Sequence, residues 1–179
     1  MKLVILDRDG VINEDSEDFI KSPEEWHGIA GSLGAISRLN HAGFTVVIAS
    51  NQSGLARGLF TIDDLNAIHQ KMLHELTQAG GQIAAILFCP HSPDEKCECR
   101  KPSPGLLREI GQRFRQDLRG VPVIGDSLRD IEAARAVGAR PMLVLTGKGR
   151  ETLERYANDL AGTAVYADLG AAVDALLEE

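Results

Sequence analysis

The chain has 179 residues, a length typical of one domain, and its 44% hydrophobic and 25% charged residues are ordinary for a globular protein. This composition excludes a collagen-like or intrinsically disordered chain. The 19 basic and 26 acidic residues give a net charge of −7, which repels a phosphate backbone, so nucleic acid is not an expected partner.

No run of the sequence approaches the ~18 consecutive apolar residues of a membrane span. The apolar start of the chain turns acidic at Asp7, unlike a signal peptide. We therefore expect a cytoplasmic protein without a membrane partner. Because no surplus apolar stripe is evident, we also expect a monomer.

Short apolar runs rich in β-forming residues alternate with longer segments whose apolar residues recur at helical spacing. The runs predict strands at residues 3–6, 44–49, 83–88, 121–124, 142–145 and 164–166. Helices between them are predicted by the stripes Leu33/Ile36/Leu39, Leu65/Ile68/Met72/Leu76, Leu107/Ile110/Phe114, Ile131/Ala134/Val137 and Leu153/Tyr156/Leu160. Helix starts are predicted by capping boxes at Thr61 and Ser127, and by Ser103 as the cap of a helix that begins at Pro104. The βα alternation predicts one α/β domain over residues 1–179, built as a doubly wound parallel sheet without a separate cap domain.

A doubly wound sheet binds its ligands outside the carboxyl ends of its strands. The irregular segments 11–31 and 89–104 both leave such an end. We expect these two segments, together with residues 55–60, to cover a site at that edge of the sheet.

Two aspartates, Asp7 and Asp9, follow the first predicted strand in a turn closed by Gly10. A carboxylate pair in this position can supply a nucleophile and a general acid/base if a metal cation relieves their repulsion. An acidic turn without chemistry is the alternative that this pair alone leaves open.

Hydroxyl, amide and backbone donors follow the second predicted strand at Ser50, Asn51, Gln52 and Ser53. These groups can hold phosphoryl oxygens or form a plain polar turn. The fourth strand is followed by Asp126, which offers a ligand for a hard cation.

Further charged residues adjoin these strand ends. Asp130 can be explained by the capping box with Ser127, or it can add a carboxylate to the cation site. Arg100 and Lys101 precede a predicted helix, whose positive N-terminus is a suitable place for a phosphate; a solvated surface pair is the alternative. Because the carboxyl ends of parallel strands lie along one edge of the sheet, we expect all these residues to form one site.

The three cysteines all lie in one short loop after the third predicted strand, at residues 89–99. Three thiolates and one imidazole match a closed tetrahedral zinc site with the ligands Cys89, His91, Cys97 and Cys99. Unrelated buried thiols beside a surface histidine are the alternative. Four protein ligands leave no position for water, so we expect a structural zinc ion that fixes the loop leading into Arg100 and Lys101.

The remaining histidines, His27, His41, His69 and His74, have no ligand spacing and are expected at the surface or as caps. Residues 146–150 follow the fifth predicted strand. We expect them to form a solvated turn rather than to touch a substrate.

Four motifs in order, DxDGV at Asp7, SN at Ser50, a later lysine at Lys101 and GDSxxD at Asp126, resemble those of the haloacid dehalogenase (HAD) superfamily of phosphatases. The resemblance covers residues 7–130, most of the chain. It implies a HAD-like fold and magnesium-dependent hydrolysis of a phosphate monoester through an aspartyl-phosphate. The implied roles are nucleophile for Asp7, acid/base for Asp9, phosphoryl binding for Ser50 and Lys101, magnesium ligation for Asp126 beside Asp7 and the Asp9 carbonyl, and support of the metal site for Asp130.

The cysteine loop ends directly in RKP, and NQSGLARG follows the second strand. Both features are similar to the heptose-bisphosphate phosphatases of the superfamily, which act in the supply of activated heptose for lipopolysaccharide. The likeness implies a phosphorylated sugar as the partner, held by Arg100 and Lys101, with Ser53 and Arg57 as candidate contacts. Histidinol-phosphate phosphatase domains share the zinc loop and are the alternative. The chain departs from some of these enzymes at Ser127, where they carry a lysine.

Two other classes of protein compete with a phosphatase. A receiver-type signalling domain also combines a parallel sheet, acidic residues and a lysine, but its phosphorylated aspartate follows the third strand, where this chain has Cys89. A zinc-dependent binding module leaves Asp7, Asp9 and Asp126 without a role. Steady turnover of a phosphate monoester distinguishes a phosphatase from both.

Overall fold

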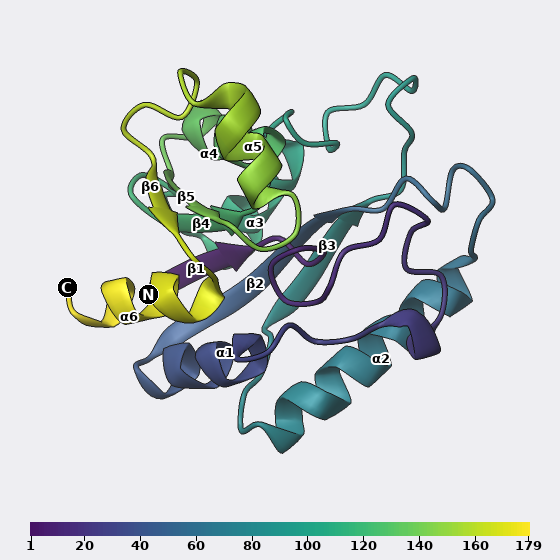
Figure 1. The fold of residues 1–179 in the computed structure, drawn as a ribbon, viewed down its shortest axis with the longest axis horizontal. Helices are drawn as coiled ribbons and strands as arrows, with labels where there is room; N and C mark the ends of the chain where they lie inside the picture. Colours follow the sequence, from purple (N-terminus) through teal and green to yellow (C-terminus); the bar gives the residue numbers. More distant parts are fainter.

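The strands of the computed structural model, which describes residues 1–179, form one parallel sheet in the order β3-β2-β1-β4-β5-β6 (Figure 1). The chain runs outward from β1 to one edge of the sheet and then returns to β4, so the order reverses between β1 and β4. Ligands of doubly wound sheets bind at such a switch point. The strand bounds are β1 Lys2–Leu6, β2 Phe44–Asn51, β3 Ala85–Cys89, β4 Pro122–Gly125, β5 Arg140–Val144 and β6 Ala164–Tyr166.

Helices cover both faces of the sheet (Figure 1). One face carries α1 (Ser32–His41), α2 (Ile62–Gln78) and α6 (Leu169–Leu177), and a short 3-10 helix, η1 (Pro23–Glu25), precedes α1. The other face carries α3 (Gly105–Phe114), α4 (Leu128–Ala136) and α5 (Gly149–Tyr156). No helix is both long and apolar enough to cross a membrane.

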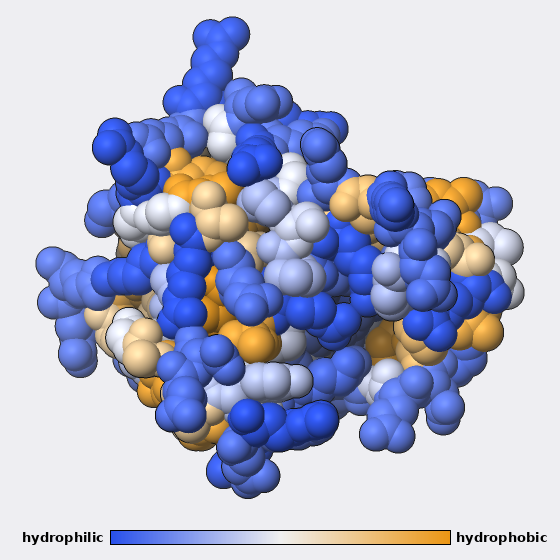
Figure 2. Space-filling model, turned by 90° about the horizontal axis from the view of Figure 1, so that it is seen from above, coloured by the Kyte–Doolittle hydropathy of each residue, from blue (hydrophilic) through white to orange (hydrophobic).

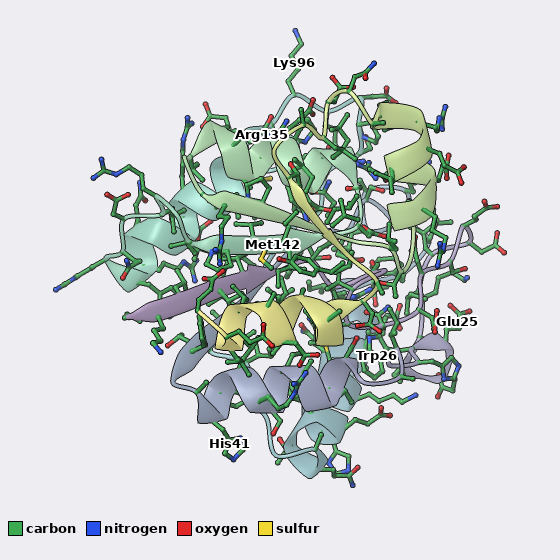
Figure 3. All side chains as sticks on the ribbon, turned by 60° about the vertical axis from the view of Figure 1, so that its left-hand side comes forward. Glu25, Trp26, His41, Lys96, Arg135 and Met142 are labelled. Atoms are coloured by element: carbon green, nitrogen blue, oxygen red, sulfur yellow. The ribbon has the colours of Figure 1, made fainter.

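The core has two halves because side chains alternate along each strand. On β1, Val4 and Leu6 pack with α1, α2 and α6, whereas Leu3 and Ile5 pack with α3 and α4. Both faces of the sheet are therefore buried, which explains why its strands read as continuous apolar runs. Met142 lies within the sheet, and Trp26, in the segment between η1 and α1, is fully buried in the same half of the core (Figure 3).

The predicted fold class is confirmed, with differences at the ends of elements. β3 begins at Ala85 rather than at residue 83, and β5 spans Arg140–Val144 rather than 142–145. The fifth predicted helical stripe, Leu153/Tyr156/Leu160, is wrong at its C-terminal end, since α5 stops at Tyr156. Helix α6 was not predicted.

The capping boxes are confirmed at Thr61 with Asp64 and at Ser127 with Asp130. The predicted cap at Ser103 is wrong: α3 begins at Gly105, with Pro104 in the cap position and no capping hydrogen bond from a side chain. The reason is that residues 100–104 form turns. The Ser103 N–H donates to the Arg100 carbonyl at 2.9 Å, and the Gly105 N–H donates to the Glu98 carbonyl at 2.8 Å.

Candidate active site

Three carboxylates meet at the switch point of the sheet. Asp7 directly follows β1 and Asp126 directly follows the neighbouring strand β4. One oxygen each of Asp7, Asp126 and Asp130 lies within 4.8 Å of the others. This approach requires Gly10, whose φ is +81°, because a Cβ there would lie 2.0 Å from Asp126 Oδ2.

Lys101 supplies a buried cation to these carboxylates. Its Nζ lies 2.6 Å from Asp130 Oδ1 and 3.1 Å from Asp7 Oδ1, and it donates to the Ala49 carbonyl at 2.7 Å. Burial acts to lower the pKa of Lys101, but the adjacent Asp130 and Asp7 carboxylates outweigh it and raise the pKa above its ordinary value. Lys101 is therefore charged at neutral pH, and its charge is balanced by the carboxylates of Asp130 and Asp7.

One lysine does not offset three carboxylates, of which Asp126 and Asp130 are buried and Asp7 is half-buried. Burial and the Asp130 charge raise the pKa of Asp7 to about 7 against the opposing effect of Lys101. Burial, Asp7 and Asp130 likewise raise the pKa of Asp126 well above 3.8. Raised carboxyl pKa values at the carboxyl edge of the sheet are what a site built for an additional cation should have before the cation binds.

The two oxygens of Asp130 differ from those of its neighbours because both accept hydrogen bonds from the protein. Oδ1 accepts from Lys101, and Oδ2 accepts from the Ser127 N–H at 3.1 Å and the Ser127 hydroxyl at 2.8 Å. By contrast, Asp7 and Asp126 each keep one carboxylate oxygen that accepts no hydrogen bond from the protein. Asp130 thus orients Lys101, while the other two carboxylates have oxygens free to bind.

Asp9 is held by a separate set of donors. Its Oδ1 accepts from Arg8 Nε at 2.9 Å, Arg8 Nη2 at 2.8 Å and Asn13 Nδ2 at 3.0 Å, and its Oδ2 accepts from Gln52 Nε2 at 3.1 Å. Burial acts to raise the pKa of Asp9, but the Arg8 charge and the hydrogen bonds from Asn13, Arg8 and Gln52 hold the pKa below 3.8. Sequence reasoning missed Arg8, because a charged residue in a turn is ordinarily solvated.

The polar residues at the end of β2 and directly after it occupy three different positions. Ser50 is fully buried, and its Oγ accepts from Gln52 Nε2 at 2.8 Å. Asn51 clamps the backbone of Lys101: its Nδ2 donates to the Lys101 carbonyl at 3.1 Å and its Oδ1 accepts the Lys101 N–H at 3.0 Å. Gln52 and Ser53 line the cleft beside Asp9.

Three arginines line the same cleft without a carboxylate partner: Arg57, Arg100 and Arg129. They lie close enough to interact, since burial and the charges of Arg129 and Arg57 lower the pKa of Arg100. Arg129 was missed in the sequence, although its place in the first turn after the GDS motif was a usable signal. Uncompensated cations around a cleft are suited to an anionic ligand.

The predicted covering segments do border the cleft, which is lined by Asp15 and Phe19 from residues 11–31 and by Pro93 from the cysteine loop. The Phe19 ring lies 5.6 Å from the Arg57 guanidinium. Viewed from above, the molecular surface is mainly hydrophilic and is hollowed beside its centre (Figure 2).

Residues 146–150 form a turn leading into α5 in which Gly147, Lys148 and Arg150 are exposed, as predicted, but the turn is also hydrogen-bonded to the acidic site. Thr146 Oγ1 donates to the Gly10 carbonyl at 2.6 Å, and the Lys148 N–H donates to Asp126 Oδ2 at 2.8 Å. The turn packs against the acidic cluster because Gly147 allows it: a Cβ there would lie 2.4 Å from Gly10 Cα. Lys148 consequently lines the cleft.

The cysteine loop brings its four predicted ligands together, all within 4.8 Å of one another. The Cys89 and Cys97 sulfurs are 3.8 Å apart, and those of Cys89 and Cys99 are 2.8 Å apart. His91 Nδ1 lies 3.4 Å from the Cys89 sulfur and 3.3 Å from the Cys99 sulfur. The tip of the loop is exposed, and Lys96 projects into solvent (Figure 3).

The other histidines do not all lie where they were predicted. His27, His41 and His74 are exposed, as expected, but His69 on α2 is only 7% exposed. Its Nε2 lies 3.1 Å from Arg8 Nη1. The expectation of a surface or capping role for His69 is therefore wrong.

The parallel sheet and the cluster of carboxylates around a buried lysine at its edge define a HAD-like hydrolase. The HAD-hydrolase-like family model matches residues 98–172, and the model of the polynucleotide kinase 3 phosphatase family matches residues 2–129. Two curated relatives, the D-glycero-β-D-manno-heptose-1,7-bisphosphate 7-phosphatases of Bordetella bronchiseptica and Pseudomonas aeruginosa, are 56% and 49% identical to this chain. The matches cover 100% of this chain and 99% of the first relative, and 98% of both chains for the second. The chain therefore belongs to the family of D-glycero-β-D-manno-heptose-1,7-bisphosphate 7-phosphatases.

Two solved structures agree with this assignment. The D,D-heptose 1,7-bisphosphate phosphatase from B. bronchiseptica, complexed with magnesium and phosphate, has a TM-score of 0.95 at 55% identity and covers 99% of each chain. The D,D-heptose 1,7-bisphosphate phosphatase from Burkholderia thailandensis has a TM-score of 0.77 at 44% identity and covers 100% of each chain. The predicted resemblance to the HAD superfamily is confirmed.

Proposed function

We propose that this chain is a magnesium-dependent phosphatase that hydrolyses the C7 phosphate ester of D-glycero-D-manno-heptose 1,7-bisphosphate. The observation that carries the proposal is that the acidic cluster around Lys101 shares one cleft with three unpaired arginines, so the cleft has room for two phosphates with different partners. Relatives similar over the whole chain are named for this reaction. We accordingly predict a place in the supply of activated heptose for lipopolysaccharide.

Asp7 is the proposed nucleophile. Its Oδ1 accepts the Arg8 N–H at 2.9 Å and lies near Lys101, which leaves Oδ2 free to attack phosphorus. The attack forms an aspartyl-phosphate and releases the ester oxygen of the sugar. Lys101, held in place by Asp130 and by the Asn51 clamp, then stabilises negative charge on the transferring phosphoryl group.

Asp7 and Asp126 are the carboxylates that fit a magnesium ion, with the Asp9 carbonyl as a further oxygen ligand. Magnesium prefers oxygen ligands, and the raised pKa values of both carboxyl groups are consistent with a missing counter-charge. A bound magnesium ion supplies positive charge that orients the phosphoryl group and stabilises its negative oxygens. We assign Asp130 a supporting role, since both its oxygens are already engaged.

Asp9 is the proposed acid/base. It protonates the leaving oxygen and then deprotonates the water that hydrolyses the aspartyl-phosphate. Its pKa is low before substrate binds, as described above. A phosphate dianion beside Asp9 raises this pKa, because a like charge disfavours the carboxylate.

The remote phosphate is assigned to the three arginines rather than to Lys101. Lys101 is 3% exposed and is already paired with two carboxylates, whereas Arg57, Arg100 and Arg129 have no such partner. Arginine binds phosphate oxygens in pairs through its planar guanidinium. Ser53, which lines the same cleft, is a further proposed contact.

We propose that Cys89, His91, Cys97 and Cys99 hold a structural zinc ion. Zinc–sulfur bonds of about 2.3 Å in a tetrahedron place the sulfurs ~3.8 Å apart, the separation found between Cys89 and Cys97, and the 2.8 Å between Cys89 and Cys99 would have to lengthen when the ion binds. The loop has few apolar residues of its own, so a metal replaces the core that it lacks. A well-ordered loop favours substrate binding, because the loop ends at Arg100 and Lys101.

Steady-state kinetics on both heptose 1,7-bisphosphate anomers and on histidinol phosphate test the proposal. We expect a higher kcat/KM for a bisphosphate anomer. Arg129→Ala and Arg100→Ala should each lower kcat/KM for the bisphosphate by roughly 30-fold, the equivalent of about 2 kcal/mol for a lost charge-assisted bond. Both variants should change histidinol phosphate turnover less than about threefold, and Arg108→Ala, at an exposed site on α3, is the control. A higher kcat/KM for histidinol phosphate overturns the substrate assignment.

Three predictions extend beyond the site. We propose that residues 1–179 form one domain, because all six strands belong to one sheet. We also propose a cytoplasmic location and a monomeric state, the latter to be measured by sedimentation.

A further inference from the structure

Arg8 lies between the two aspartates to which chemistry is assigned, yet its side chain is fully buried. A buried charge is unfavourable unless it is paired and hydrogen-bonded. Each guanidinium nitrogen has a partner: Nε and Nη2 donate to Asp9 Oδ1 at 2.9 and 2.8 Å, and Nη1 lies 3.1 Å from His69 Nε2. Arg8 is therefore directed at Asp9 from one side and held by His69 from the other.

His69 reaches Arg8 from α2, a helix 61 residues further along the chain. Burial and the Arg8 charge lower the pKa of His69 to about 4, so the imidazole is neutral at physiological pH. Arginine has no acceptor atom. His69 Nε2 consequently accepts from Arg8 Nη1, and the ring proton resides on Nδ1.

The two carboxylate oxygens of Asp9 have different hydrogen-bond partners. Oδ1 accepts three N–H groups, two from Arg8 and one from Asn13. Oδ2 accepts only from Gln52, and both Asp9 and Gln52 line the cleft. One oxygen is thus anchored to the interior of the protein by three donors, and the other has a single hydrogen bond, in a residue that lines the cleft.

We propose that Arg8 and His69 are positioning residues that anchor Asp9 Oδ1, so that Oδ2 is the atom that transfers the proton during phosphate-ester cleavage. The inference rests on the proposed function. In the first step the Asp9 Oδ2–H bond breaks and its proton passes to the ester oxygen, while that oxygen takes the electron pair of its bond to phosphorus and Asp7 bonds to phosphorus. In the second step the water oxygen bonds to phosphorus while Asp9 Oδ2 takes a proton from that water, and the bond between phosphorus and Asp7 breaks with its electron pair returning to the Asp7 carboxylate.

A defect in proton delivery depends on the leaving group, whereas general damage to the site does not. An alkoxide leaving group, as in a sugar phosphate, needs a proton, and general acid catalysis contributes about 10²- to 10⁴-fold. Nitrophenolate, from p-nitrophenyl phosphate, leaves without one. A comparison of the rates on the two esters therefore distinguishes a positioning role of Arg8 and His69 from a merely structural one.

The experiment compares His69→Leu, which removes the acceptor, with His69→Gln, whose amide oxygen can accept from Arg8. Because Asp9 also acts in the second step, which is the same for both esters, the rate compared is that of the first step, formation of the aspartyl-phosphate in a single turnover. We expect His69→Leu to lower this rate at least about tenfold for heptose 1,7-bisphosphate and less than about threefold for p-nitrophenyl phosphate. His69→Gln should recover most of the loss. His74→Leu, an exposed position on the same helix, should leave both rates unchanged.

Equal losses on the two esters, or no loss on either, overturn the inference. If His69→Leu does not fold, Arg8→Lys replaces it, because lysine keeps the charge but cannot make the paired bonds to Asp9 Oδ1; the same dependence on leaving group is expected. Asp9→Asn separates this inference from the proposed function. If Asp9→Asn shows the dependence and the His69 variants do not, only the positioning role fails, whereas a wild-type protein that hydrolyses neither ester refutes both.

Discussion

Replacement of Lys101 by methionine should destabilise the protein in a way that depends on pH. Methionine preserves most of the apolar stem but removes the Nζ atom that contacts Asp130 at 2.6 Å, Asp7 at 3.1 Å and the Ala49 carbonyl at 2.7 Å. Three carboxylates then share the site without any cation. The variant therefore measures how strongly this lysine compensates the acidic cluster.

The size of the effect follows from the geometry. Two unit charges 3.1 Å apart attract by ~5 kcal/mol at an effective dielectric constant of about 20, before desolvation is subtracted. Removal of one partner from a buried ion pair typically costs about 3–5 kcal/mol, because the other charge is left uncompensated. We expect a loss of this size in the free energy of unfolding at pH 8 without magnesium. At pH 5 the loss should be smaller, since Asp7, with a pKa of about 7, is protonated in the folded protein and no longer attracts Lys101.

Urea unfolding of the wild type and Lys101→Met at both pH values, followed by circular dichroism, measures the difference. The control is Arg108→Met, an exposed substitution expected to change stability by less than about 0.5 kcal/mol. A loss below about 1 kcal/mol at pH 8, or an equal loss at pH 5 and pH 8, would refute the reasoning.

Gly147→Ala should weaken magnesium binding at least about tenfold by calorimetry, because a Cβ there would lie 2.3 Å from Asp126 Oδ2; unchanged affinity contradicts this role of Gly147. Because the pKa of Asp7 is about 7 in the folded protein and ~4 in the unfolded chain, the metal-free protein should lose thermal stability as the pH rises from about 4 to about 7. Asp7→Asn should flatten this part of the pH profile, and an identical profile in the variant rules out Asp7 as its source. Cys97→Ser should lower the zinc content from about one ion per chain, measured by elemental analysis, and reduce activity through Arg100; a variant with full zinc and full activity counts against the structural metal.

Much of the fold could be predicted because strands buried on both faces read as continuous apolar runs. The ends of elements were less certain, since apolar character and strand pairing are different properties. Ile83 packs against the core without belonging to β3, and Arg140 pairs within β5 although it is charged. Helix α6 was missed even though Leu169 and Leu176 recur at helical spacing on its buried side.

The acidic cluster could also be predicted, because the topological rule brings Asp7 and Asp126 to one edge of the sheet. The groups that hold Asp9 could not. The contact between Arg8 and His69 joins residues 61 positions apart, and it depends on how α2 packs against the turn after β1. Sequence spacing carries no signal for a contact of that kind, and a charge in a turn ordinarily points to solvent.

The central claim, that Asp7 becomes phosphorylated by a sugar bisphosphate, is tested most directly by trapping the intermediate. The protein is mixed with magnesium and heptose 1,7-bisphosphate, quenched in acid within one turnover and digested, and the peptides are weighed by mass spectrometry. We predict one phosphoryl group on the peptide that contains Asp7 and none in Asp7→Asn, which should also lack turnover. Turnover by Asp7→Asn at a rate near that of the wild type, or a phosphoryl group on another residue, would contradict the claim.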